Sequence, residues 1–107
     1  MNDASLNVRT TGDQVHFTLS GDVDLANASD IEAELRAAIP NRATSVTLDL
    51  SGVTYLDSAG LQVVFALTIR LRRLQIDIRV IAPEDSPARH AIDMAGMASI
   101  AAIEPSY

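Results

Sequence analysis

Four stretches of the chain alternate between apolar and polar residues, which is the period-two pattern of a β-strand with one buried face. They cover residues 5–10, 14–20, 46–51 and 75–82. The first two are separated only by Thr11, Gly12 and Asp13, a combination typical of a tight hairpin connection. After the third stretch we expect a short loop that leads to Asp57. The pattern therefore predicts an N-terminal hairpin followed by two more strands.

A first helix is predicted over residues 25–39, where apolar residues recur at helical spacing. The residues on its apolar face are Ala28, Ile31, Leu35 and Ile39. Asp24, Asn27 and Ser29 can each cap a helix N-terminus, and we favour Asp24 as the N-cap. Pro40 follows the pattern directly and is expected to end the helix.

A second helix is predicted over residues 61–73, which are too dense in apolar side chains to alternate. Its natural N-cap is Asp57 or Ser58, because a short side-chain oxygen can accept from an otherwise unpaired backbone N–H. The basic residues of its last turn are Arg70, Arg72 and Arg73. Cations are favourable there because the helix dipole is negative at that end. The surplus of apolar side chains either helps to dock a partner or is buried with the rest.

A short third helix is predicted over residues 88–95. Ser86 is placed to cap it, Pro87 suits the first helical position, and Gly96 is the expected stop. The apolar residues 97–103 then form either a last edge strand or a closing segment.

Strand, helix and strand in succession predict a parallel, right-handed crossover. A chain of 107 residues is large enough for one core and too small for two. We therefore expect an α/β fold in a single domain spanning residues 1–107. It should have a mixed β-sheet of four to five strands, helices packed mainly on one face, and the other sheet face open.

The amino-acid composition argues against several classes of function. Acidic residues outnumber basic ones by 14 to 8, the reverse of what direct nucleic-acid binding requires. The absence of cysteine excludes disulfides, thiol catalysis and thiolate metal sites. The first residues lack a signal-peptide pattern, and no apolar run approaches a membrane span. We expect a cytoplasmic domain without membrane insertion.

Ser58 is the residue with the clearest chemical potential. Its hydroxyl should lie where free N–H groups and the positive end of a helix dipole converge, so it can cap the helix, hold an anion or carry a phosphate. The surrounding residues are not a G-x-S-x-G nucleophile elbow, and His16 and His90 are isolated histidines typical of a surface. No phosphate loop or metal-ligand spacing is present. We predict no catalytic residue, no metal ligand and no cofactor.

Three motifs together resemble a known family. Asp57-Ser58-Ala59-Gly60-Leu61, after a strand ending Leu48-Asp49-Leu50, resembles the phosphorylation segment of bacterial anti-sigma factor antagonists, which are STAS domains. Gly21-Asp22-Val23-Asp24 is similar to the family's turn before the first helix. Residues 88–97 are similar to its closing helix and glycine stop. The resemblance extends over nearly the whole chain and implies a STAS-like fold.

The resemblance also implies a partner-switching cycle. The unphosphorylated antagonist would bind an anti-sigma factor that is also an ATP-dependent serine kinase, and thereby free a sigma factor. The kinase would phosphorylate the antagonist and release it, and a metal-dependent serine phosphatase would restore it. Carried over residue by residue, the phosphoacceptor falls on Ser58. The implied partner-binding residues are Asp22, Asp24, Asp57, Ser58, Ala59, Gly60 and Gln62. Weak homodimerisation stays open.

Two departures from the family pattern are visible. Ala59 stands where a second Ser or Thr is frequent, so Ser58 has no neighbouring acceptor. Leu74-Gln75-Ile76 lacks the glycine through which family members often turn, which leaves the shape of this turn open. The alternative function is a STAS subunit of a membrane transporter or of a stress-signalling scaffold, which shares the fold.

Overall fold

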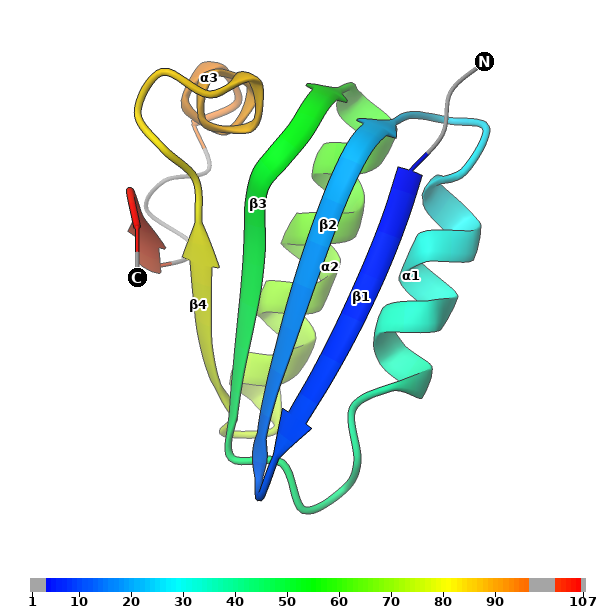
Figure 1. Ribbon diagram of the computed structural model, residues 1–107, viewed down its shortest axis with the longest axis vertical. Coiled ribbons are helices and arrows are strands. Elements are labelled where there is room, and N and C mark those ends of the chain that lie inside the picture. Colours follow the sequence, from blue (N-terminus) through cyan, green and yellow to red (C-terminus); the bar gives the residue numbers. More distant parts are fainter. Residues whose placement is uncertain (1–3, 97–101, 107) are drawn as a thin grey trace.

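The computed structural model, which describes residues 4–96 and 102–106, contains a five-stranded sheet and three helices (Figure 1). In chain order the elements are β1 (Ala4–Thr11), β2 (Gln14–Val23), α1 (Ala28–Ala37), β3 (Ser45–Leu56), α2 (Ser58–Arg73), β4 (Asp77–Ile81), α3 (Pro87–Met94) and β5 (Ala102–Glu104). The strands follow one another in the sheet in sequence order. The hairpin β1–β2 is antiparallel and the other three pairings are parallel. The predicted mixed α/β fold is confirmed.

Helices α1 and α2 run side by side against one face of the sheet, and α3 lies beyond the end of β4, beside β3 (Figure 1). The core lies between that face and the helices. Its fully buried large side chains include Phe17, Leu19, Leu35, Leu48, Leu50, Leu71 and Ile92. Phe17 is the one aromatic side chain among the buried core residues that the structure describes, so the core is aliphatic as the composition suggested.

The opposite face of the sheet is polar. Across four neighbouring strands, Arg9 lies opposite His16, His16 opposite Thr47, and Thr47 opposite Arg79. These side chains are exposed or half-buried. The expected open sheet face is therefore present.

Strand β3 is longer than predicted because it contains two bulges. Against β2, the paired positions are Thr18 with Asp49, Ser20 with Gly52, Gly21 with Val53, and Asp22 with Tyr55. Each shift gives β3 one extra residue, which breaks the alternation on which the sequence prediction rested. Asp49 accepts a hydrogen bond of 2.9 Å from the amide of Ser51 at the first bulge. The predicted loop before Asp57 is thus wrong: the strand continues to Leu56.

Helix α1 begins at Ala28, so the predicted start at residue 25 and the predicted N-cap Asp24 are wrong. The carboxylate of Asp24 accepts from the amide of Ala26 at 2.9 Å, and its carbonyl accepts from the amides of Asn27 and Ala28. Asp24 therefore closes a turn that precedes the helix, and Asn27 occupies the N-cap position. The helix ends at Ala37, before the proline that was expected to stop it.

The end of α2 explains how the chain turns without glycine. Gln75 has φ of 61°, in the left-handed region. Its amide donates to the carbonyl of Arg72, and the amide of Ile76 donates at 2.8 Å to the carbonyl of Leu71. These two bonds form a Schellman motif, in which glycine is usual at the left-handed position. Glutamine is therefore unusual at position 75, although the hydrogen bonds of the turn are those of a regular Schellman motif.

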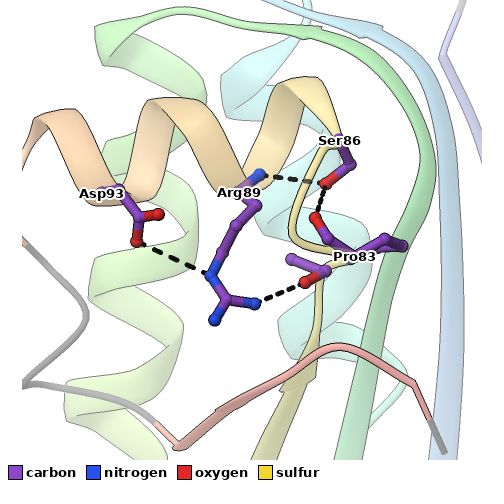
Figure 2. A network of polar contacts seen from close by, with 5 residues as sticks. Pro83, Ser86, Arg89 and Asp93 are labelled. Atoms are coloured by element: carbon purple, nitrogen blue, oxygen red, sulfur yellow. Dashed lines mark hydrogen bonds and ion pairs between the residues drawn. The ribbon is translucent and has the colours of Figure 1, made fainter.

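The N-terminus of α3 carries a compact polar network (Figure 2). The hydroxyl of Ser86 donates to the carbonyl of Pro83 at 2.7 Å and accepts from the amide of Arg89 at 3.2 Å. The guanidinium of Arg89 donates to the carbonyl of Ala82 at 2.6 Å and lies 3.6 Å from the carboxylate of Asp93. This network joins α3 to the end of β4.

The predicted boundaries of α3 are largely confirmed. Ser86 is the N-cap and Pro87 is the first helical residue. Gly96 has φ of 70° directly after the helix, as expected of a glycine stop. Of the segment expected to form an edge strand or a closing segment, Ala102 and Ile103 belong to β5, and residues 97–101 lie outside the described residues.

An ion pair holds β5 beside β4. Arg79 donates to both carboxylate oxygens of Glu104, at 2.8 and 2.7 Å. These hydrogen bonds, together with the positive charge of Arg79, lower the pKa of Glu104 below its ordinary value of 4.5. The carbonyl of Glu104 also accepts from the amide of Ala82 at 2.7 Å.

Replacing Gln75 by glycine should stabilise the protein. The left-handed conformation costs a residue with a side chain about 1–2 kcal/mol, and glycine adopts it freely at a smaller cost in unfolded-state entropy. We expect Gln75→Gly to raise the free energy of unfolding by up to about 1 kcal/mol in urea titrations. Gln62→Gly, in the second turn of α2, is the control and should lower it by about 1 kcal/mol. A loss of stability in Gln75→Gly would contradict the conclusion that the left-handed backbone conformation of Gln75 is strained.

The Arg79–Glu104 pair should be sensitive to acid. Because the folded pKa of Glu104 is lowered, the pair contributes stability above the unfolded pKa and loses it as the pH falls through the folded pKa. NMR titration of the Glu104 carboxyl should give a pKa below 4.5 in the wild type and a higher one in Arg79→Gln. Equal pKa values in both proteins would show that the pair does not form in solution.

Candidate functional site

The candidate site lies at the N-terminus of α2, where β3 ends (Figure 1). Ser58 is the first residue of α2, and its side chain is exposed. The N-cap is Asp57, one of the two predicted alternatives, whose Oδ1 accepts from the amide of Gly60 at 3.0 Å. Ser58 is thereby fixed at the helix start without serving as the cap itself.

Asp57 also connects α2 to the segment that follows β2. Its Oδ2 accepts from the amide of Leu25 at 3.2 Å, and its own amide donates to the carbonyl of Val23 at 3.2 Å. One carboxylate thus bridges two segments that are 32 residues apart in the sequence. The motif around Asp57 and the motif at residues 21–24 consequently form one surface.

The turn after β2 is held by side chains as well as by backbone. Asn27 accepts from the amide of Asp24 at 3.0 Å and donates to the carbonyl of Asp22 at 2.8 Å. The carboxylate of Asp22 accepts from the hydroxyl of Thr54 on β3. Asp24 is only 8% exposed. Asp22 and Asp24 therefore shape the turn, whatever else they contact.

Gly60 is buried at the closest approach between α2 and the sheet. A Cβ at this position would lie 2.5 Å from Cδ1 of Leu56 and 3.0 Å from both the carbonyl oxygen and Cγ1 of Val23. Such distances are shorter than van der Waals contact, and one of the neighbours is backbone, which cannot easily move. Glycine is required here by packing.

The seven predicted site residues therefore separate by accessibility. Ser58 and Gln62 are exposed, and Asp57 and Ala59 are half-buried on the first two turns of α2. Gly60 is buried, Asp22 is half-buried near the end of β2, and Asp24 is buried at the start of the turn that follows.

Sequence reasoning missed Leu25 at this site. Its side chain is 82% exposed, because its amide is held by Asp57 and the helix begins only three residues later. The prediction had placed it inside the helix. The pair Asp24 and Asn27, both prone to turns in which a side chain bonds nearby backbone, was the available signal. Tyr55, exposed after the second bulge of β3, was missed because that segment was expected to be a loop.

The two histidines lie on elements that do not contain Ser58. His16 is in the middle of β2, opposite Thr47 on the open sheet face, and His90 is exposed on α3. Within residues 4–96 and 102–106, no group of three or more His, Asp or Glu side chains is arranged to hold a metal ion. None of the described helices is long and apolar enough to cross a membrane.

Comparisons with known proteins agree with this architecture. A protein-family model described as "Mlab, STAS domain" matches residues 6–102. A Bordetella bronchiseptica protein named "Putative anti-sigma factor antagonist BtrV" is 37% identical over 82 residues, which are 77% of this chain and 70% of that protein.

Solved structures share the fold. The crystal structure of an anti-sigma factor antagonist from Mycobacterium paratuberculosis superposes with a TM-score of 0.84 and 22% identity, covering 97% of this chain and 87% of that one. The Bacillus cell fate determinant SpoIIAA in its phosphorylated form gives 0.66 and 20%, covering 92% of this chain and 90% of that one.

Replacing Gly60 by alanine should destabilise the protein. Although alanine is the better helix former, its methyl group would overlap Leu56 and the backbone of Val23. We expect the free energy of unfolding in urea to fall by about 1–3 kcal/mol, the usual cost of overpacking. Gln62→Ala, an exposed position on the next turn, is the control and should change it by less than about 0.5 kcal/mol. Equal effects of the two substitutions would contradict the conclusion that Gly60 packs too closely against Leu56 and Val23 to admit a methyl group.

Proposed function

This chain belongs to the STAS domain family, and on that basis we propose that it is an anti-sigma factor antagonist switched by phosphorylation of Ser58. In this proposal the unphosphorylated protein binds an anti-sigma factor that is also a serine kinase, and so frees a sigma factor. Phosphorylation of Ser58 releases the protein, and a serine phosphatase restores it. The protein acts by binding, in the cytoplasm, as one STAS domain over residues 1–107, without catalytic residues or cofactor.

The observation that carries the proposal is the accessibility of Ser58 at a fixed helix start. A kinase must reach the hydroxyl, and Ser58 is exposed directly after a cap that holds the backbone in place. Ser86, which precedes α3, offers the opposite case. It is buried, and its hydroxyl both accepts from Arg89 and donates to Pro83. Of these two serines at helix starts, only Ser58 suits modification.

Related proteins support the same role. The 37% identical relative is named as an anti-sigma factor antagonist, and so is the protein whose structure superposes with a TM-score of 0.84. SpoIIAA, which has this fold, has been solved in a phosphorylated form. By the motif resemblance, the acceptor in this chain would be Ser58.

A phosphate on Ser58 should alter binding more than folding. It adds about −1.5 to −2 charges at neutral pH, and the N-terminal amides of α2 favour an anion by about 0.3–1 kcal/mol. Across an interface, the same charge beside Asp57 loses hydration and repels acidic groups of the partner. A tenfold loss of affinity needs only about 1.4 kcal/mol. We therefore expect release of the partner without unfolding.

The site residues take two roles in this proposal. Ser58, Ala59, Gln62 and Asp57 lie at the surface, where they would contact the kinase directly. Gly60, Asp22 and Asp24 would act by positioning that surface, through the packing and the turn described above.

Phosphorylation can be tested by intact-mass analysis after incubation with ATP and cytosolic extract of the host. We expect one phosphate on the wild type and none on Ser58→Ala, because the motif resemblance assigns the acceptor to Ser58 alone. Ser29→Ala is the matched control, since Ser29 is also an exposed serine in the first turn of a helix, and it should be modified like the wild type.

Other outcomes would change the proposal. Phosphate on both the wild type and Ser58→Ala would move the switch to another residue. An unmodified wild type, in an extract whose kinases are active, would favour the transporter or scaffold subunit. If the phosphorylated and unphosphorylated proteins bound the purified kinase with equal affinity, phosphorylation would not release the protein from its partner, and that step of the proposal would be wrong.

A further inference from the structure

Positive charge is concentrated at the end of the molecule farthest from Ser58. All eight basic residues of the chain are arginines. Five of them lie where α1 and α2 end and in the loop after α1, at the end of α2 opposite its Ser58 start (Figure 1). They are Arg36, Arg42, Arg70, Arg72 and Arg73. All five are exposed, and the ion pairs within residues 4–96 and 102–106 involve Arg79 and Arg89 instead.

A pocket of about 170 Å³, lined by polar as well as apolar groups, opens between two of these arginines, Arg36 and Arg70. Its apolar lining includes Ile39, Leu71, Leu74 and Ile76, and Arg36 and Arg70 also line it. We call it the arginine pocket. Leu74 is 56% exposed, so its side chain is accessible at the edge of this pocket. The helix dipoles account for arginines at these helix ends, but they do not account for an open pocket between them with leucine and isoleucine in its lining.

The opposite end of the same molecule carries the complementary features. Leu25 projects from the turn after β2 with 82% of its side chain exposed. Asp57 contacts its amide, and Asp22 is the last residue but one of β2, just before that turn. The donors to these two carboxylates are neutral: backbone amides for Asp57 and a hydroxyl for Asp22. The negative charges beside Leu25 are therefore not compensated by these bonds.

We propose that the arginine pocket of one copy of this chain receives Leu25 of a second copy. In this contact, Arg36 and Arg70 of the first copy face Asp57 and Asp22 of the second. An apolar side chain next to a carboxylate meets a pocket that has leucine and isoleucine in its lining and guanidinium groups at its sides, which bond carboxylates well. Because the two surfaces lie at opposite ends of α2, one copy cannot satisfy its own pocket.

The geometry of the contact fixes the kind of assembly. Each copy offers one pocket and one Leu25, so the interface is head-to-tail and leaves a free surface at both ends of any open oligomer. The net charge of −6 makes whole copies repel one another, so we expect weak association with chain growth limited to high concentration. The contact does not depend on the proposed function, although it would cover the surface next to Ser58.

Sedimentation velocity over a range of protein concentrations tests the contact. At about 0.1 M ionic strength, the average mass should rise with concentration, and at about 1 M salt, where charges are screened within about 3 Å, it should rise less. Leu25→Ser and Arg70→Glu should each weaken association about tenfold or more. The matched controls are Met94→Ser, at another exposed apolar side chain (76%), and Arg9→Glu, on β1. Both should associate like the wild type.

Mixing the two variants tests the direction of the contact. Leu25→Ser keeps an intact pocket and Arg70→Glu keeps an intact Leu25, so an equimolar mixture should form a dimer that does not grow further. A wild type that stays monomeric at every concentration would overturn the proposal and leave the pocket to an acidic segment of another protein. Association that persists in both variants would overturn it as well. Circular dichroism verifies folding, and Arg70→Gln replaces Arg70→Glu if the charge reversal unfolds the chain.

Discussion

The two hydrogen bonds accepted by the carboxylate of Asp57 join the segments that form the candidate site. One oxygen caps α2 through Gly60, and the other fixes the turn after β2 through Leu25. The first bond stabilises a helix, and the second decides where a distant segment lies. The amide of Asp57 also donates to the carbonyl of Val23, and Gly60 packs against the same residue, so the motif at residues 21–24 and the start of α2 are neighbours through several contacts. Both the exposed serine and the exposed leucine depend on this one side chain.

Local sequence rules predicted the regular parts of the fold well. The alternation at Val15, Phe17 and Leu19 located β2 because helices cover one face of that strand. Ser86 and Pro87 located α3 because capping is a short-range interaction. These features depend on residues that are close in the sequence, so they can be predicted from the sequence pattern.

The parts that could not be predicted depend on contacts between distant residues. Asp24 has the chemistry of an N-cap, but the hydrogen bonds made by the Asn27 side chain and by the Leu25 amide favour a turn and delay the helix to Ala28. The bulges of β3 arise from its register with β2 and leave no period in the sequence. The proposed acceptor, Ser58, follows from motifs in the sequence, whereas the exposure of Leu25 and the arginine pocket emerge only when α1, α2 and the turn are assembled.

The close packing of Gly60 has a consequence for how the proposed modification of Ser58 would be transmitted. Because there is no room even for a methyl group between Gly60 and the residues Leu56 and Val23, the first turn of the helix has little space in which to shift toward the sheet. A modification two residues earlier therefore has little means of producing a long-range allosteric rearrangement. Information added there must be read by whatever molecule touches that surface. The domain would then act as a rigid recognition surface. Substitutions on that surface could change the recognised partner without altering the fold.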